Sequence, residues 1–324
     1  MWRTGLIDSR TIDCIYIAAS ANDARFTRIC VASIRHFYPE AVIKLLAGGK
    51  LEPGLREELA RHWNVGAADI PTGNWGWGFV KLEPLFGRAG ERFLVVDSDT
   101  IFAGPVLDAW AASAADFLVD DERQTEADTR RLYYDWSKVA AIDSTARPPQ
   151  FVFNTGQWFG TAGVLDRRDF DLMIDWDSLP PKLRHPALFP PNDQGVMNYV
   201  INRSAMSNGL LVGRSKIMHW PSHGMNGITA KAVIQREAPP VIVHWAGLKA
   251  ARLRTLPGAD VLALFEGQYY SKIPLGLLLM RLRSARSFLA FIFRVMLTRA
   301  QLVMQKLRAL LARQLVATKA PTIQ

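Results

Sequence analysis

The part of the chain that most suggests chemistry is a pair of aspartates directly after an apolar segment. Residues 92–96 (RFLVV) read as a buried strand, and Asp97-Ser98-Asp99 follows at once. Two carboxylates at i and i+2 beside a core are costly to bury without a counter-charge. A divalent cation supplies that charge, and hard oxygen ligands suit Mg²⁺ or Mn²⁺. Such an ion can bridge a diphosphate and stabilise the charge that develops when the diphosphate leaves.

Polar residues also follow two other segments that are predicted to be strands. Asn154 follows residues 150–153 (QFVF), and His244 follows residues 241–243 (VIV). In open α/β sheets, ligands bind beyond the carboxyl ends of the strands, where such side chains would meet. Asp and Asn are also ordinary turn formers after a strand, so any one of these polar residues could serve the turn alone. Three such positions in one domain favour a shared site.

The elements that must position these residues form an α/β pattern with a mostly parallel sheet. Further strands are predicted at residues 13–19, 41–47 and 116–119, and helices through residues 26–37 and 51–63. The chain has no Walker-type phosphate-binding loop, no CxxC pair and no GxSxG elbow. These absences argue against a P-loop NTPase, a zinc site of the CxxC type and a serine hydrolase of the elbow type.

Four segments, taken in order, resemble the GT-A-fold glycosyltransferases of family 8, which are retaining galactosyl- and glucosyltransferases. FLVVDSDTIF at 93–102 resembles their DxD segment, and FNTG at 153–156 resembles their Phe-Asn-(Ser/Ala)-Gly segment. DQGVMN at 193–198 resembles their Asp-Gln-Asp-x-x-Asn segment, and VHWAG at 243–247 resembles their His-x-x-Gly segment. The resemblance spans about residues 13–250.

The resemblance implies a metal site and a set of catalytic groups. Asp97 and Asp99 would bind Mn²⁺, or Mg²⁺, together with His244, whose imidazole is a ligand when neutral. A strand-end histidine with no such role is the plain alternative for His244. Three residues would surround the transferred sugar and its anomeric carbon: Asn154, Asp193 and Gln194.

The same resemblance implies positions that bind the nucleotide-sugar donor. Asn22 would lie near the base, after the first strand. Lys81 falls where the family carries Arg in a Tyr-Ala-Arg-Leu segment and would touch the diphosphate or sugar, although a lone Lys on a helix is usually just solvated. The remaining donor-binding candidates are Ser98 within the DxD segment, Gly247, and Lys249 as a phosphate ligand.

The sequence departs from the family pattern at several of these positions. Ser20 and Ala21 stand where many members carry acidic residues, and Gly195 occupies the third position of the Asp-Gln-Asp segment. Lys249 comes one position early, and the Pro-Trp that usually follows is missing. The resemblance therefore indicates the reaction class, whereas the exact sugar, and retention as opposed to inversion, stay open.

The net charge of +9 is unevenly distributed along the 324 residues. Of the 39 basic residues ten lie beyond Glu266, the last acidic residue, so residues 1–266 hold 29 basic against 30 acidic residues. A neutral body with a basic tail argues against a nucleic-acid binder, whose charge would lie on the folded domain. The tail predicts a basic helix that lies on anionic lipid, or one that packs on its own domain or a second subunit.

We therefore expect a GT-A-type domain at residues 1–265 and a helical, membrane-associating tail at 266–324. Only two cysteines occur, which predicts two buried thiols rather than a disulfide, and the N-terminus lacks the pattern of a signal peptide. A cytoplasmic protein, peripheral at the inner face of the membrane, is the expectation. Its expected partners are a nucleotide sugar, namely a UDP-sugar, and a glycan or glycolipid acceptor, and no nucleic acid.

Two other functions remain open on the sequence. A sugar nucleotidyltransferase shares the fold, but no glycine-rich basic loop follows the first predicted strand. A catalytically silent, membrane-bound scaffold would also keep the fold. The intact set of Asp97, Asp99, His244 and Gln194 argues against that scaffold.

Overall fold

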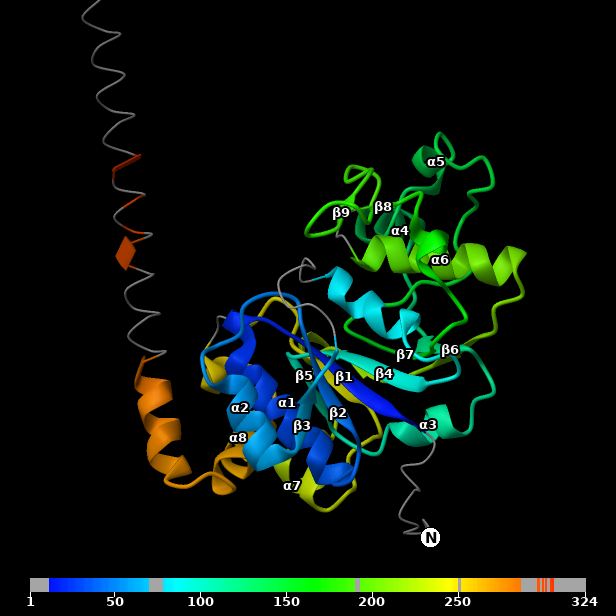
Figure 1. Cartoon of the computed structure of the whole chain (residues 1–324). Coiled ribbons are helices and arrows are strands. Elements are labelled where there is room, and N and C mark those ends of the chain that lie inside the picture. Colours follow the sequence, from blue (N-terminus) through cyan, green and yellow to red (C-terminus); the bar gives the residue numbers. More distant parts are fainter. Residues whose placement is uncertain are drawn as a thin grey trace, which may run out of the picture. The chain divides into compact units, whose positions relative to one another are not determined.

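A computed structural model describes residues 12–69, 78–189, 193–249 and 252–286, and further along the chain 296, 297, 299, 301, 304 and 305. The larger of two compact units reaches to Lys272 and is built on a seven-stranded sheet of order β10-β6-β7-β4-β1-β2-β3 (Figure 1). The strands are β1 (Cys14–Ala19), β2 (Ile43–Ala47), β3 (Val65–Ala67), β4 (Arg92–Asp97), β6 (Phe117–Asp120), β7 (Gln157–Thr161) and β10 (Val212–Ser215).

Most neighbours in this sheet are parallel, and only β7 runs antiparallel between β4 and β6. Strand β1 is buried along its whole length and β4 at four of its six positions. Strands covered on both faces read as continuous apolar runs, as CIYIAA and FLVV do here. This confirms the mixed α/β class with a mostly parallel sheet.

A second, three-stranded sheet begins directly after the aspartates, in the order β11-β12-β5. Its strands are β5 (Thr100–Phe102), β11 (Met218–His219) and β12 (Ile242–His244). Strand β12 pairs antiparallel with β5, and His244 lies opposite Thr100. That register brings the end of β12 beside the turn that leaves β4.

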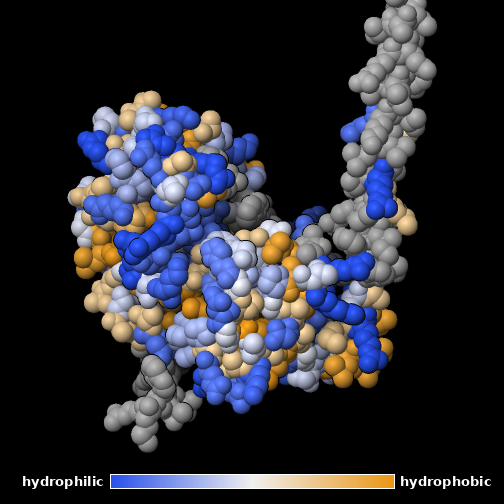
Figure 2. All heavy atoms as spheres, turned by 180° about the vertical axis from the view of Figure 1, so that it is seen from behind, coloured by the Kyte–Doolittle hydropathy of each residue, from blue (hydrophilic) through white to orange (hydrophobic). Residues whose placement is uncertain are grey.

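Helices cover the sheets and carry part of the site. The α-helices are α1 (Ala24–Phe37), α2 (Leu55–Trp63), α3 (Leu107–Ala111), α4 (Glu126–Leu132), α5 (Trp136–Val139), α6 (Asp193–Ser207), α7 (Ala230–Ile234) and α8 (Ala259–Ser271). The 3-10 helices are η2 (Ala21–Asp23), η3 (Phe79–Phe86), η4 (Arg167–Phe170), η5 (Pro221–His223) and η6 (Leu253–Thr255), and a small hairpin pairs β8 (Ile174–Asp175) with β9 (Lys182–Leu183). The lobe with α4, α5 and α6 is mostly hydrophilic on the face in Figure 2.

The predicted strand at residues 150–153 is wrong. Only Val152 pairs with another backbone segment there, in an isolated bridge with Glu122, and the strand of this region is β7, which starts at Gln157. Side chains of α6 satisfy the backbone of 150–153 in place of a neighbouring strand. The apolar run 151–153 therefore marked a segment that is buried at Val152 and Phe153 but is not a strand of the sheet.

Helix α8 belongs to the larger unit, so this unit extends beyond residue 265, where the sequence predicted its end. Glu266 forms a two-bonded ion pair with Arg25 of α1, with the shorter contact at 2.7 Å, and Tyr269 stacks on Trp63 of α2. Both contacts would be cut by a boundary inside α8. The compact unit ends instead at Lys272.

The predicted basic tail is described only in part. Residues 276–286 are helical, with exposed apolar side chains at Leu277, Leu278 and Leu282, and Leu275 is exposed in the turn just before this helix. No helix within the described residues is long and apolar enough to cross a bilayer. Most of residues 287–324, and with them the greater part of the predicted basic tail, lies outside the described residues.

Candidate active site

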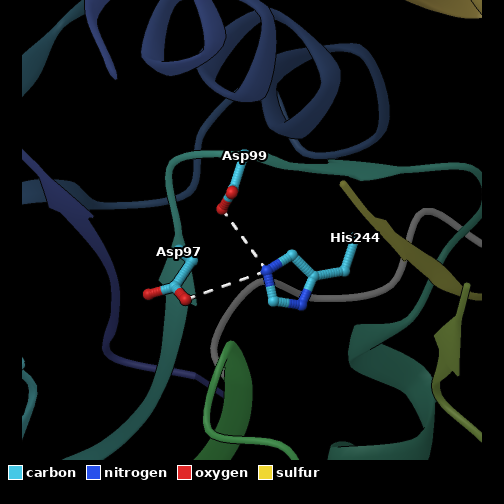
Figure 3. A group of neighbouring side chains, drawn as sticks. All are labelled: Asp97, Asp99 and His244. Carbon is cyan, nitrogen blue, oxygen red and sulfur yellow. Dashed lines mark ion pairs between the residues drawn. The ribbon is translucent and has the colours of Figure 1, made fainter. Parts of the chain in front are cut away.

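Asp97, Asp99 and His244 meet at the carboxyl end of β4 (Figure 3). Asp97 is the last residue of β4, Asp99 lies in the turn before β5, and His244 is the last residue of β12. His244 Nε2 lies 3.4 Å from Asp99 Oδ1 and 3.8 Å from Asp97 Oδ2. One ligand atom from each residue lies within 4.8 Å of the others. The spacing suits three ligands of one cation.

The imidazole of His244 is held by packing. Trp220 stacks on it with ring centroids 5.3 Å apart, and the main-chain N–H of Trp245 donates to Asp99 O at 2.9 Å. Gly156 comes so close that a Cβ there would lie 2.2 Å from His244 Cε1. The ring fits only because this position has no side chain, which gives the Phe-Asn-Thr-Gly segment a steric reason for its glycine.

Each aspartate turns one oxygen toward His244 and the other toward a lysine. Asp97 Oδ1 lies 3.1 Å from Lys81 Nζ, and Asp99 Oδ2 lies 3.5 Å from Lys249 Nζ. Lys249 also contacts Asp23 Oδ1 at 3.1 Å. Asp97 Oδ2 also accepts a longer hydrogen bond from Lys81 Nζ, at 3.5 Å, so of the two oxygens that face the imidazole only Asp99 Oδ1 has no hydrogen-bond partner within the described residues.

Lys81 joins the metal-site aspartate to the start of α6. Its Nζ lies 2.7 Å from Asp193 Oδ2 and donates to Thr155 O at 3.2 Å, besides the contact with Asp97. Burial lowers the pKa of Lys81, but the carboxylates of Asp193 and Asp97 outweigh it, so that the pKa is raised and the ammonium stays charged. All three of its hydrogens therefore have an acceptor within this network.

The two aspartates differ in their electrostatic environments. Burial raises the pKa of Asp97, opposed in part by Lys81. Burial also acts on Asp99, but the nearby imidazole of His244 and the charge of Lys249 outweigh it and lower its pKa. This network holds four carboxylates, Asp23, Asp97, Asp99 and Asp193, against two lysines. A neutral His244 would leave two negative charges, the charge of one divalent cation.

The donor set fits such a cation. Asp99 Oδ1 is buried and has no hydrogen-bond partner within the described residues, and its 3.4 Å contact to His244 Nε2 is long for a hydrogen bond. A buried carboxylate oxygen without a partner is costly, and a metal ion would satisfy it. Two carboxylates and an imidazole are ordinary ligands of divalent metal ions.

Asp193 and Gln194 open α6 and face the Asn154 segment. Thr155 Oγ1 donates to Asp193 Oδ2 at 2.8 Å, and Asn154 Nδ2 donates to Gln194 Oε1 at 2.9 Å. Gln194 Nε2 donates in turn to the carbonyl of Leu132 at 3.2 Å. The three predicted catalytic residues therefore lie together, and Lys81 links Asp193 to Asp97 of the metal cluster.

Comparisons with known proteins give the fold. No family model and no curated protein matches the sequence. Among solved structures, the galactosyltransferase LgtC in complex with donor and acceptor sugar analogues matches with a TM-score of 0.55 and 14% identity, over 81% of this chain and 96% of that one. The apo structure of the bifunctional glycosyltransferase WbbM matches with a TM-score of 0.51 and 13% identity, over 82% of this chain and 50% of that one.

The chain has a GT-A-type glycosyltransferase fold. An active-site mutant of LgtC also matches, with a TM-score of 0.53 and 12% identity, over 78% of this chain and 95% of that one. At these low identities the TM-scores show shared architecture alone; the aspartate pair lies at the sheet edge where α/β folds bind ligands. The expected fold is confirmed.

Steric contacts explain why Gly195 stands where the family pattern has Asp in the DQGVMN segment at 193–198. Gly195 packs against the chain before α5, and a Cβ there would lie 2.4 Å from the carbonyl oxygen of Tyr133. An aspartate cannot be built at that position without moving the backbone. The packing of this chain therefore requires glycine at position 195 and leaves no room for the carboxylate.

The remaining donor-binding candidates are more dispersed. Asn22 is exposed on η2, and its neighbour Asp23 makes the contact to Lys249. Ser98 is buried, and its hydroxyl has no hydrogen-bond partner within the described residues. Gly247 lies in a turn with φ of 74°, the left-handed region that favours glycine.

Three residues that contact the site were not predicted from the sequence: Asp23, Thr155 and Trp220. Thr155 lies inside a recognised segment and could have been inferred from its position before Gly156. Asp23 and Trp220 carry no local signal, because their partners Lys249 and His244 are remote in sequence or on another strand.

Proposed function

We propose that the protein is a metal-dependent glycosyltransferase that transfers a hexose from a nucleotide sugar, a UDP-sugar, to a glycan or lipid-linked acceptor, with retention of configuration. The observation that carries the proposal is the Asp97–Asp99–His244 cluster, with its buried unpartnered carboxylate oxygen, at the ligand-binding edge of a GT-A fold. LgtC, which has the same fold, was crystallised with donor and acceptor sugar analogues.

Asp97, Asp99 and His244 would hold the metal ion. The mixed carboxylate and imidazole set suits Mn²⁺ better than Mg²⁺, which favours oxygen ligands alone. When bound, the ion would neutralise the diphosphate leaving group. Lys249 Nζ is close to Asp99 and partly exposed, so it can turn toward a phosphate oxygen without losing its partner Asp23.

Lys81 is a buried residue that holds the site together through its contacts with Asp97, Asp193 and Thr155. To reach the diphosphate directly, its buried ammonium would have to give up Asp193, Asp97 or Thr155. In this arrangement it fixes the distance between the metal-site aspartate and the first turn of α6. Its contribution to donor binding then comes through those carboxylates.

Asn154, Asp193 and Gln194 would surround the anomeric carbon. In front-side attack, the acceptor oxygen bonds to C1 as the bond from C1 to the phosphate oxygen breaks, and the acceptor proton passes to the departing phosphate. The amide oxygen of Gln194 and the carboxylate of Asp193 would stabilise the positive charge at C1. No covalent intermediate with the protein is required.

The tail would place this reaction at a membrane. Ten basic residues and no acidic ones follow Glu266, and the described part of the tail exposes leucines at 275, 277, 278 and 282. This composition suits a helix lying on anionic lipid, each basic residue near the surface contributing about 1 kcal/mol. The protein would then act at the cytoplasmic face on a lipid-linked glycan.

A donor screen tests the proposal. UDP-sugars are incubated with the full chain in Mn²⁺ or in EDTA, and released UDP is measured. We expect hydrolysis or transfer with at least one donor in Mn²⁺ and none in EDTA, with Asp99→Asn inactive and the exposed Asp171→Asn unaffected. Binding of UDP and Mn²⁺ without turnover of any donor would favour the scaffold function, and turnover in EDTA would exclude the metal role.

A further inference from the structure

Segment 150–153, which is buried at Val152 and Phe153, is held by two asparagines of α6 instead of a neighbouring strand. Asn198 Oδ1 accepts from Phe153 N at 2.9 Å, and its Nδ2 donates to Phe153 O at 2.8 Å. Asn202 Oδ1 accepts from the N–H of Gln150 at 2.8 Å, and its Nδ2 donates to Phe151 O at 3.0 Å. Each side-chain amide thus pairs with the segment's backbone as another strand's peptide group would.

The second N–H of each side-chain amide is satisfied by a backbone carbonyl of α6 itself. Asn198 Nδ2 also donates to Gln194 O, and Asn202 Nδ2 to Asn198 O, both at 2.9 Å. Both side chains are fully buried. Four residues of α-helix rise about 6 Å, close to the roughly 6.7 Å of two residues of extended chain. Asparagines four apart on α6 therefore meet carbonyls two apart, at 151 and 153.

The same row of amides continues into the active site. Gln194 lies one helical turn before Asn198 and accepts from Asn154 Nδ2, so residues 194, 198 and 202 face one stretch of chain. On its other side this stretch is tied to the metal cluster, because the Asp97 N–H donates to Gly156 O at 2.7 Å. A shift of residues 150–153 would therefore move Asn154 away from Gln194.

We propose that Asn198 and Asn202 are positioning residues that hold Asn154 against Gln194 and thereby set the rate of sugar transfer without setting donor affinity. The donor's nucleotide and metal would be bound by β1, β4 and β12 residues, which the two asparagines do not touch. The part of this inference that concerns rate rests on the proposed function, whereas the clamp itself is a property of the fold.

Amide hydrogen exchange of the full chain tests the clamp directly. In Asn198→Ala, peptides covering 151–156 should exchange at least about tenfold faster, because two buried hydrogen bonds to Phe153 are lost. Strand β4 should keep its protection. Met206→Ala, at an exposed position of the same helix, serves as the matched control and should exchange as the unsubstituted chain does. Unchanged exchange at 151–156 in Asn198→Ala would overturn the clamp.

Kinetics separate positioning from general loss of structure. Asn198→Ala should lower turnover at least about tenfold while the UDP dissociation constant in Mn²⁺ changes less than about twofold. Asn202→Ala, one turn further from Gln194, should show the same pattern with a smaller loss, and it keeps the test available if Asn198→Ala does not fold. Parallel losses of affinity and turnover, or unaltered turnover beside faster exchange, would refute the positioning role. If the unsubstituted chain turns over no donor, the proposed function fails and hydrogen exchange still decides the clamp.

Discussion

The closest steric constraint in the candidate site is the contact between Gly156 and His244, and Gly156→Ala tests it. A Cβ at this position would lie 2.2 Å from His244 Cε1, 2.5 Å from Nδ1 and 2.7 Å from Asn154 Oδ1. Ordinary contact begins near 3.4 Å, so the imidazole must withdraw by more than about 1 Å. Metal–nitrogen bonds tolerate only about 0.2 Å. The substitution should therefore remove His244 from the metal.

Two magnitudes follow from this displacement. Crowding a packed site with one methyl group costs about 1–3 kcal/mol of stability. In a unit of this size, each kcal/mol lowers the melting temperature by about 2–4 °C. Disturbing the orientation of a metal ligand typically weakens binding by about 10–100-fold. We therefore expect a modest fall in melting temperature and at least a tenfold rise in the Mn²⁺ dissociation constant.

Calorimetric titration with Mn²⁺ measures the second effect without any need for a donor. Gly66→Ala in β3 is the matched control, since a Cβ there has its nearest neighbours at 3.7 and 3.8 Å. Thermal unfolding of Gly156→Ala, alone and combined with His244→Ala, measures the loss of stability. Without the imidazole, the cost of Gly156→Ala should shrink, leaving the smaller conflict with Asn154. Equal Mn²⁺ affinity, or an equal stability cost with and without the imidazole, would refute the reasoning.

The other predictions concern the metal, the anomeric centre, the tail and the thiols. Asp99→Asn should bind UDP in Mn²⁺ no better than the unsubstituted chain binds it in EDTA, as calorimetry would show. Gln194→Ala should lose at least about 10²-fold in turnover and keep most UDP affinity, since its contacts serve the transition state; normal turnover would remove it from the site. A chain ending at Lys272 should fold and bind UDP but no longer sediment with anionic liposomes, and equal sedimentation would contradict the anchor. Burial raises the pKa of the Cys14 and Cys30 thiols to about 12, so thiol reagents at pH 8 should label them only after unfolding.

The aspartate pair could be found from the sequence because its signal is local. An apolar run long enough for a buried strand ends in two carboxylates, and both the strand and the cost of burying the charges can be read from adjacent residues. The prediction of two buried free thiols rests on equally local patterns and is confirmed. The end of the predicted strand 241–243 also placed His244 near the same edge of the fold, whereas Asn154 follows a segment that is not a strand.

The error at residues 150–153 shows where such reading stops. The apolar run in QFVF marks a segment that is buried at Val152 and Phe153, but a strand also needs a backbone partner, which the segment itself does not encode. Here the partners are Asn198 and Asn202, whose amides take the place of a neighbouring backbone. The domain boundary shifted for a similar reason, because α8 is held by Arg25 and Trp63 from the other end of the chain.

The sequence by itself determined the α/β class, the aspartate pair, the order of the four family-like segments and the separation of a neutral body from a basic tail. Each of these depends on residues that are neighbours in the chain. Only the tertiary structure decided that His244 faces both aspartates, that Lys81 joins Asp97 to Asp193, and that Gly156 makes room for the imidazole. These contacts depend on strand register and on which distant group satisfies a buried charge, so no local pattern can specify them.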